Sequence, residues 1–218
     1  MSAIIDFDQN ILRSEKKYIT RSRCYAFELL NFLGAREQHT QRSVASIYFD
    51  TLAFNSFFDG EEGSVPRKKY RYRVYNEELP TEKKTKQISG VFEKKETFAT
   101  GRSKLKWRRA LSDINDLTAE ARETFQNKQL FPTIYIQYER RYFRLSNVDI
   151  TVDFNMNACK VTSDYRFLNR FFDDRSVIEV KQNLRENIEC PVERKIPLLS
   201  ARFSKYCEFS KRLLICRT

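Results

Sequence analysis

The amino-acid sequence predicts an α+β protein built around an antiparallel β-barrel of about eight strands, with helices flanking it. Residues 70–75 alternate strictly, so that Arg71 and Arg73 share one strand face while tyrosine and valine occupy the other. Charged residues two positions apart recur in several other segments, and the connections between segments are short, which favours antiparallel pairing. Strands with one charged and one apolar face suit a barrel with a polar interior and an outer face covered by helices.

The first part of the chain predicts two strands, a helix and a loop. Alternation over Ile11–Tyr18 predicts the first strand, and Thr20 is a suitable cap for a helix that runs to Leu33 and ends at Gly34. Its apolar stripe is expected to hold Cys24, Phe27, Leu30 and Phe32 or Leu33. Aromatic and β-branched residues predict a strand at Ser43–Thr51, and Gly60, Gly63 and Pro66 indicate a loop after it.

The remaining strands and helices are predicted from the same two periodicities of apolar residues, which are about 2 residues for a strand and about 3.6 for a helix. Polar, lysine-rich residues 76–90 predict an exposed connection. Apolar residues at helical spacing predict helices at Asn115–Leu130 and Ser200–Ile215. Alternating or β-branched stretches predict strands at Val91–Glu96, Lys104–Ala110, Thr133–Leu145, Val148–Asn155 and Val177–Lys181.

Composition indicates one folded domain that binds an anionic partner. The 218 residues are 41% hydrophobic and 14% aromatic, with 5 Gly and 5 Pro, which is typical of a globular core and excludes a disordered chain. The net charge is +11. Residues 61–110 concentrate it, with 15 Lys and Arg against 7 Asp and Glu, on or beside the charged strands.

Cysteine and histidine usage excludes a zinc site of the usual spacing. The 5 cysteines form no CxxC pair, and His39 is the single histidine. The N-terminus lacks the features of a secretory signal, and no apolar run approaches the roughly 20 residues that cross a bilayer. We therefore expect a cytoplasmic protein with reduced thiols, associated with a membrane only through a partner.

An ordered set of short motifs spans the chain from about residue 13 to 210. The motifs are Glu15-x-Lys17, Ser46–Thr51, Arg71-x-Arg73, Glu93-x-Lys95, Lys106-x-Arg108, Tyr138-x-Arg140, Asp153, Glu179-x-Lys181 and Arg202–Lys205. The set resembles the VTC domain, the polyphosphate polymerase branch of the triphosphate tunnel metalloenzymes. That resemblance implies a tunnel fold, transfer of the ATP γ-phosphate to polyphosphate, and a Mn²⁺ or Mg²⁺ cofactor.

The resemblance also implies roles for individual residues. The phosphate ligands carried over by position are Lys17, Arg71, Arg73, Lys95, Lys106, Arg140 and Lys205. Tyr138 and Ser204 would add hydrogen bonds, and Glu179 would hold the metal. Further phosphate-binding candidates are Arg202, Arg108, Lys104 and Lys181; further metal candidates, from strand parity, are Glu15 and Glu93. Expected partners are ATP, polyphosphate and pyrophosphate, with a membrane protein that exports the polymer.

Three points stay open in the sequence. Arg13 stands where the wider superfamily has the first glutamate of its Glu-x-Glu-x-Lys motif, which favours a polymerase over a simple hydrolase. Asp153 either orients a tunnel base or caps a turn at residues 155–157, and the turn is favoured. On the predicted strand Thr133–Leu145, Ile134 and Ile136 share a face with Tyr138 and Arg140, so either the first half of the strand faces apolar neighbours or a bulge shifts the register.

Alternative functions are a triphosphatase of the same fold, a non-catalytic polyphosphate-binding protein and a nucleic-acid-binding module. A nucleic-acid site would combine the net charge with the tyrosines of residues 70–75. However, alternation places Tyr70 and Tyr72 on the face opposite Arg71 and Arg73, so they cannot grip one strand together. No nucleic acid is expected as a partner.

Overall fold

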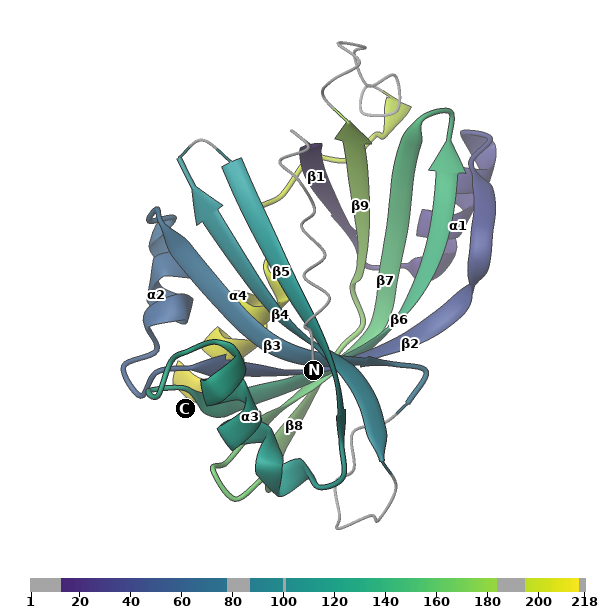
Figure 1. Ribbon diagram of the computed structural model, residues 1–218. Helices are drawn as coiled ribbons and strands as arrows, with labels where there is room; N and C mark the ends of the chain where they lie inside the picture. The colour runs from purple at the N-terminus through teal and green to yellow at the C-terminus, as the bar shows by residue number, and fades with distance from the viewer. Residues whose placement is uncertain (1–12, 78–86, 100, 184–194, 216–218) are drawn as a thin grey trace.

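The computed structural model describes residues 13–77, 87–99, 101–183 and 195–215, which form one nine-stranded antiparallel sheet with short helices against it (Figure 1). The strands are β1 (Arg13–Thr20), β2 (Arg36–Asp50), β3 (Arg67–Tyr75), β4 (Ile88–Phe98), β5 (Gly101–Leu111), β6 (Phe131–Leu145), β7 (Val148–Val161), β8 (Phe167–Asp173) and β9 (Ser176–Asn183). The helices are α1 (Arg23–Phe32), α2 (Asn55–Glu62), α3 (Leu117–Thr124) and α4 (Lys205–Ser210), with a 3₁₀ turn at Ile114–Asp116 and a π turn at Lys211–Ile215.

The sheet curls into an open barrel. Its strand order is β1-β9-β7-β6-β2-β3-β4-β5, and β8 pairs only with β7. The curl brings the two edge strands, β1 and β5, to the same side of the molecule (Figure 1). Within the described residues no backbone pairing joins these two edges. The predicted antiparallel barrel is therefore confirmed as a curled sheet that does not close.

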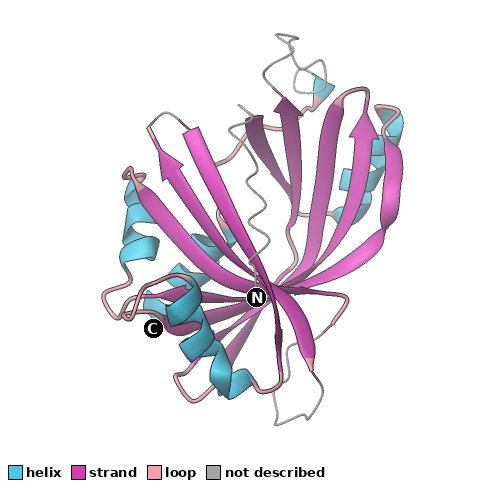
Figure 2. Ribbon diagram, viewed as in Figure 1, coloured by secondary structure: helices cyan, strands magenta, loops and turns pink. Residues whose placement is uncertain are grey.

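Two hydrophobic clusters lie on the outer face of the curl, where helices cover it (Figure 2). The first packs α3 against β3 and β4, with Tyr72 and Phe92 fully buried beside Phe125. The second packs α1 against β7 and β9, around Leu30 and Ile150. These are the apolar faces of the alternating strands, so most of the core lies outside the barrel, as its charged interior requires.

A third cluster lies inside the barrel, at the end that α4 occupies. Residues Ile134 and Ile136 of β6 pack there with Tyr206 and Phe209 of α4, all of them buried. Each such side chain contributes roughly 2 kcal/mol by leaving water. Tyr138 belongs to the same cluster, so β6 keeps its alternation and its first half faces apolar neighbours; no bulge in β6 is needed.

The helices differ from their predicted ranges. Thr20 ends β1, and Ser22 caps α1 by accepting a hydrogen bond from the backbone N–H of Tyr25 (3.2 Å). The predicted apolar stripe is wrong at Cys24, which is exposed, while Ala26 and Leu29 are buried without having been predicted. Leu30 is buried and Phe27 packs against the same cluster, and of the two alternatives Phe32 and Leu33 it is Leu33 that packs there. The two later helices are shorter than predicted: α3 ends at Thr124, just before Gln126 with φ +52°, and α4 begins only at Lys205. The 3₁₀ turn precedes α3 and the π turn follows α4.

Two elements were not predicted. The residues around Gly60 form α2 and not the predicted loop. Glycine is needed at this position because α2 packs closely against α4: a Cβ there would lie 2.6 Å from the Cys207 sulfur. Strand β8 contains Asn169 with φ +55°, which interrupts the alternation that would identify a strand. The expected connection at residues 76–90 is shorter, since β4 begins at Ile88, and residues 78–86 lie outside the described residues.

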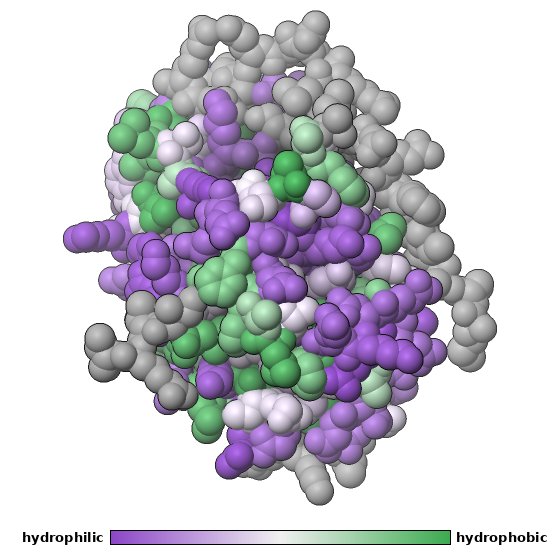
Figure 3. All heavy atoms as spheres, turned by 90° about the vertical axis from the view of Figure 1, so that its left-hand side faces the viewer, coloured by the Kyte–Doolittle hydropathy of each residue, from purple (hydrophilic) through white to green (hydrophobic). Residues whose placement is uncertain are grey.

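The side of the molecule that carries α2 and α3 shows hydrophilic side chains over much of its area, with apolar groups gathered between them (Figure 3). No helix among the described residues is both long and apolar enough to cross a membrane.

Candidate functional site

One wall of the barrel interior, formed by β3, β4 and β5, encloses a carboxylate with cations. Glu93 pairs with Arg71, receives a bond from Lys104 Nζ at 2.9 Å and lies 3.9 Å from Arg73. Only 4% of the Glu93 side chain is exposed. The strand register creates this cluster, since Arg71 and Lys106 are the residues opposite Glu93 on its two neighbours. We call Arg71, Arg73, Glu93 and Lys104 the arginine wall.

Side chains of β2 and β6 hold the two guanidinium groups in place. Arg71 donates to the Tyr48 hydroxyl at 3.1 Å. Arg73 donates to Ser46 Oγ and to the Tyr138 hydroxyl, each at 3.2 Å. A planar guanidinium fixed at several nitrogens keeps one orientation, so this wall is preorganised for an anion. Tyr138 lies in the interior, where the sequence placed it, and its hydroxyl contacts Arg73.

The electrostatics of the arginine wall follow from burial. Burial alone would raise the pKa of Glu93, but Arg71, Arg73 and Lys104 hold it well below its usual value. Burial lowers the pKa of Lys104 to about 7, with Arg71 and Arg73 adding to the shift and Glu93 opposing it. Lys104 is therefore the group of this wall that changes charge near neutral pH.

A second carboxylate, Asp153 of β7, is fully buried and organises the floor of the interior. It accepts two hydrogen bonds from the Arg140 guanidinium and one from Lys205 of α4. Burial opposes the charge on Asp153, but these cations lower its pKa to about 2. The favoured role of Asp153 as a turn cap is thus wrong: β7 continues through residues 155–157, and only a bulge with φ +49° at Asn155 interrupts it.

The opposite wall, formed by β1 and β9, shares its carboxylates among lysines. Lys17 Nζ lies 3.2 Å from Glu15 and 4.0 Å from Glu179, and Lys181 Nζ lies 2.9 Å from Glu179. Lys17 also donates to the backbone carbonyl of Phe203 at 2.9 Å. We call Glu15, Lys17, Glu179 and Lys181 the lysine wall. Its side chains are more exposed than Glu93, from 10% for Glu179 to 32% for Lys181.

Among the residues that the structure describes, side chains bridge the two barrel edges. Glu15 of β1 accepts a hydrogen bond from Arg102 of β5 at 3.0 Å and lies 3.6 Å from Lys95 of β4. Burial lowers the pKa of Lys95 to about 8, although Glu15 opposes the shift. The carboxylate of Glu15 thus contacts Lys17 in the lysine wall as well as Lys95 and Arg102 near the opposite edge of the sheet.

The residues just before α4 cross the interior from β1 to β3. Ser200 pairs with Tyr18, and the backbone N–H of Ala201 donates to the Lys17 carbonyl at 2.8 Å. At the other end, Ser204 caps α4 and accepts a hydrogen bond from Lys69 at 2.7 Å. We call residues 200–204 the strap. Together with the apolar cluster of α4, it closes one end of the interior.

The structure gathers most of the sequence-predicted residues but separates two. Arg202 is exposed and donates to the Gly60 carbonyl of α2, and Arg108 is exposed at the far end of β5. Lys69 was missed, although it continues the inward row of Arg71 and Arg73 two residues earlier, which was the available signal. The interior therefore collects more basic side chains than carboxylates, an arrangement that favours a bound polyanion.

Only part of the carboxylate set suits a metal ion. In the described part of the chain, no three or more His, Cys, Asp or Glu side chains group together as a metal site. Glu15 and Glu179 suit a hard cation better than Glu93, because both lie within 4.0 Å of the Lys17 nitrogen and are partly exposed, and Mg²⁺-type ions take one or two carboxylates plus substrate phosphates. Glu93 fits less well, since two guanidinium groups and Lys104 enclose it and only 4% of its side chain is exposed.

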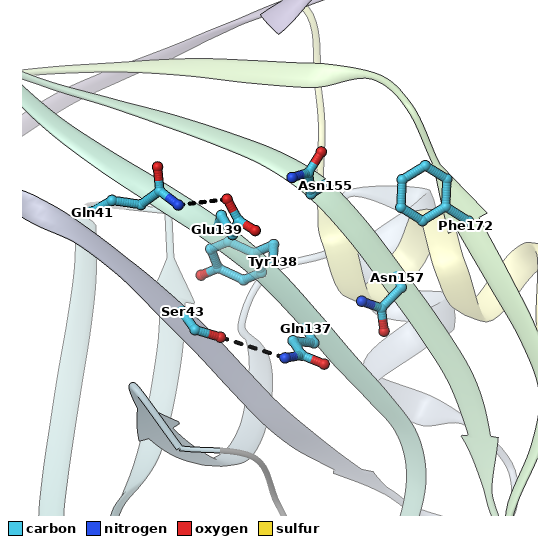
Figure 4. A pocket seen from close by; sticks show the side chains of 8 residues that line it. All are labelled: Gln41, Ser43, Gln137, Tyr138, Glu139, Asn155, Asn157 and Phe172. Carbon is cyan, nitrogen blue, oxygen red and sulfur yellow. Dashed lines mark hydrogen bonds between the residues drawn. The ribbon is translucent and has the colours of Figure 1, made fainter.

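A pocket of about 450 Å³ lies away from these walls, over β2, β6 and β7 (Figure 4). Amide and hydroxyl groups line it, with Gln41 bonded to Glu139 (2.6 Å) and Gln137 to Ser43 (3.4 Å). It contains no lysine or arginine, so it does not extend the cationic interior.

Comparisons with known proteins agree with this geometry. The family model of the VTC domain matches residues 7–214. No curated protein sequence matches the chain. A putative adenylate cyclase from Vibrio parahaemolyticus is similar in structure, with a TM-score of 0.54 and 12% identity over 93% of this chain and 99% of that one.

Two further solved structures are similar. A putative adenylyl cyclase from Hippeastrum with a dominant triphosphatase activity gives a TM-score of 0.54 and 14% identity, covering 93% of this chain and 97% of that one. The PH1012 protein from Pyrococcus horikoshii gives 0.51 and 14%, covering 89% and 98%. At these identities the likeness concerns the fold, and it confirms the predicted tunnel architecture.

Proposed function

The chain belongs to the VTC domain family, and from this premise we propose that it is a polyphosphate polymerase that transfers the γ-phosphate of ATP to a growing polyphosphate chain. The observation that supports this function most directly is the convergence of basic side chains from both walls and from α4 on one interior. The cations exceed the carboxylates there, so the site is complete only with an anion bound.

Phosphoryl transfer requires positioning and charge neutralisation more than covalent help from the protein. Arg71 and Arg73 would hold alternate phosphates of an extended chain, since alternate residues of a strand lie about 7 Å apart. Arg140 and Lys205, oriented by Asp153, would face them from the floor. Lys17, Lys95 and Lys106 complete the proposed phosphate ligands, with Lys104 and Lys181 beside them. The transferred group would thus move between fixed cations.

A divalent cation, Mn²⁺ or Mg²⁺, would neutralise phosphate oxygens when bound. Glu179 and Glu15 are the residues that we propose to hold it. Lys17 lies between them, so it would hold the adjoining phosphate oxygen and separate the two carboxylates. Glu93 takes a different role in this proposal, as the group that orients Arg71 and Arg73.

A triphosphatase of the same fold is the second candidate. The observation that favours it is the strap, which crosses one end of the interior and is tied to β1 and β3, so a short triphosphate would suffice to occupy the cationic walls. The Hippeastrum protein with triphosphatase activity has the same fold.

Incubation with ATP and Mn²⁺ or Mg²⁺ distinguishes the two activities. A polymerase gives long polyphosphate on a stained gel together with ADP, whereas a triphosphatase releases only orthophosphate or pyrophosphate. Arg73→Ala, purified in parallel, controls for contaminating enzymes. Absence of both products, with polyphosphate binding retained, would point to a non-catalytic binding protein.

Cytoplasmic localisation and a membrane partner that exports the polymer belong to the same proposal. They would follow from polymer synthesis in the cytosol, where ATP is available. Co-purification of a membrane protein with the tagged chain, lost on detergent extraction of membranes, would test the association.

A further inference from the structure

We propose that Tyr48 is a further phosphate ligand of the arginine wall, whose hydroxyl donates a hydrogen bond to a phosphate that Arg71 also holds. The Ser46–Thr51 motif contains this tyrosine, but the resemblance assigns it no role. The inference rests on the proposed function and adds a residue to the same site. It holds equally for a polymerase and for a triphosphatase, because both place phosphates on Arg71.

The hydrogen of the Tyr48 hydroxyl has no acceptor among the residues that the structure describes. The hydroxyl oxygen accepts a hydrogen bond from Arg71 at 3.1 Å, and only 6% of the residue is exposed. Other buried tyrosines donate: Tyr206 to the Asp50 carboxylate at 2.6 Å, and Tyr72 to a backbone carbonyl at 3.1 Å. Since buried hydroxyls are normally paired, the unused hydrogen of Tyr48 indicates a ligand as its acceptor.

Arg71 presents a fork for a phosphate beside this hydroxyl. Its Nε donates to Glu93, its Nη2 lies against the same carboxylate oxygen, and its Nη1 donates to Tyr48. A further hydrogen remains on each terminal nitrogen, and such a pair grips a phosphate bidentately. The Arg71 side chain is 21% exposed, so an anion can reach it. A phosphate has several oxygens, so one can accept from Tyr48 while others face the guanidinium.

The same pairing of arginine with tyrosine recurs along the wall. Arg73 donates to the Tyr138 hydroxyl at 3.2 Å, and in the described part of the chain the hydrogen of that hydroxyl also has no acceptor. The register of β2 against β3 places Tyr48 directly opposite Arg71, whereas Tyr138 reaches Arg73 from β6. Each arginine of β3 thus has a tyrosine hydroxyl beside it, free to donate to the phosphate on that arginine.

The surroundings of Tyr48 fix the hydroxyl in a cationic environment. Its ring stacks on that of Tyr206, with centroids 5.1 Å apart and planes inclined by 17°. Burial alone would raise the pKa of this hydroxyl, but Arg71, Arg73 and Lys205 lower it below its usual value. Positive charges from β3 and from α4 therefore face the hydroxyl, and an anion between them is within its reach.

A double-mutant cycle separates a direct contact with phosphate from an effect through Arg71. The probe is inorganic tripolyphosphate, titrated by calorimetry at low ionic strength, where the remaining cations bind it most strongly. Tyr48→Phe should weaken binding about tenfold, and it should still weaken binding at least about threefold in the Arg71→Ala protein. A smaller loss in the Arg71→Ala protein would show that Tyr48 acts only by orienting Arg71, which overturns the inference.

A second measurement leaves Arg71 unchanged. Tyr48→3-fluorotyrosine makes the hydroxyl a stronger donor and a weaker acceptor. At about pH 6, where the phenol is protonated, this protein should bind tripolyphosphate at least as tightly as the wild-type protein does. Weaker binding would show that the hydroxyl matters as the acceptor of Arg71 and not as a donor to phosphate, which also overturns the inference.

Tyr206→Phe is the matched control, since it removes a hydroxyl from the same pair of stacked rings, but one that donates to Asp50. It should lower the free energy of unfolding and leave tripolyphosphate affinity within about twofold of the wild-type value. A larger loss would show that packing of the rings, and not the Tyr48 hydroxyl, holds the phosphate, and the inference would fail.

The same titrations distinguish this inference from the proposed function. If the wild-type protein binds tripolyphosphate and Tyr48→Phe binds it equally well, the inference is overturned while the proposed function stands. If the wild-type protein binds neither tripolyphosphate nor long polyphosphate, the proposed function fails together with the inference.

Discussion

The two walls of the barrel interior use the same alternating strands but treat their carboxylates differently. In the arginine wall, Glu93 is enclosed by guanidinium groups that tyrosines hold in place. In the lysine wall, Glu15 and Glu179 share flexible ammonium groups and remain partly exposed.

The difference indicates a division of labour. An arginine pinned at several nitrogens keeps its geometry when the ligand leaves, whereas a lysine is a mobile point charge that can change partners. We therefore expect the arginine wall to set the register of the phosphate chain. We expect the lysine wall to be the one that can admit a cation.

The largest expected effect comes from breaking the arginine wall. Arg73→Ala should lower the rate of polymer synthesis by about 10²- to 10³-fold, because it removes a preorganised cation from a buried site. Arg73→Lys should recover little of that loss, since an ammonium cannot reach Ser46 and Tyr138 together. Circular dichroism checks that both variants fold. Wild-type activity in Arg73→Lys would remove the distinction between the walls.

Breaking the lysine wall should change the metal requirement. Glu179→Gln should raise the Mn²⁺ concentration for half-maximal activity by about tenfold or more, because it removes a carboxylate donor. Glu93→Gln is the matched control, and it should lower activity without moving that concentration. An unchanged Mn²⁺ titration in Glu179→Gln, or a shift in the control, would contradict the assignment.

A smaller effect is expected from the protonation of Lys104, which should make phosphate binding at the arginine wall depend on pH. Its pKa of about 7 lies below that of an exposed lysine because of burial, and a bound phosphate should raise it again. Binding should then take up a proton above pH 7, and affinity should decline as pH rises from about 7 toward the pKa of the bound state, by at most about tenfold per pH unit.

Calorimetry in two buffers of different ionisation enthalpy, at about pH 8, measures this proton uptake. Lys104→Arg should take up fewer protons than the wild-type protein, since arginine stays charged throughout this range, and Lys95, with a pKa of about 8, should account for the remaining uptake. Equal binding enthalpies of the wild-type protein in the two buffers would contradict the prediction.

The smallest effect on function should come from a site outside both walls. Ser22→Ala removes the cap of α1 and should lower the free energy of unfolding by about 1 kcal/mol, measured by urea denaturation. Polymer synthesis at room temperature should be unchanged. A loss of activity there would mean that general destabilisation, and not the walls, explains the larger effects.

The predicted faces of the strands were reliable because strand alternation is local. Residues such as Arg71, Arg73 and Lys17 needed only the two-residue period to be assigned to one face. The helix ends were less reliable, since Ser22 and Thr20 are both capable caps and only the packing of α1 selects between them. Similarly, Gly60 looks like a loop residue until its contact with Cys207 is known.

The sequence alone determined which side chains share a strand face, and therefore that the charged face must be separated from the apolar one. The tertiary structure decided how each charge is paired: that Asp153 holds Arg140 and Lys205, that Lys69 joins the strap, and that Glu15 of β1 contacts Arg102 of β5. Alternation depends on backbone geometry within one strand. Pairing depends on register, bulges and curl, which contacts between distant segments set.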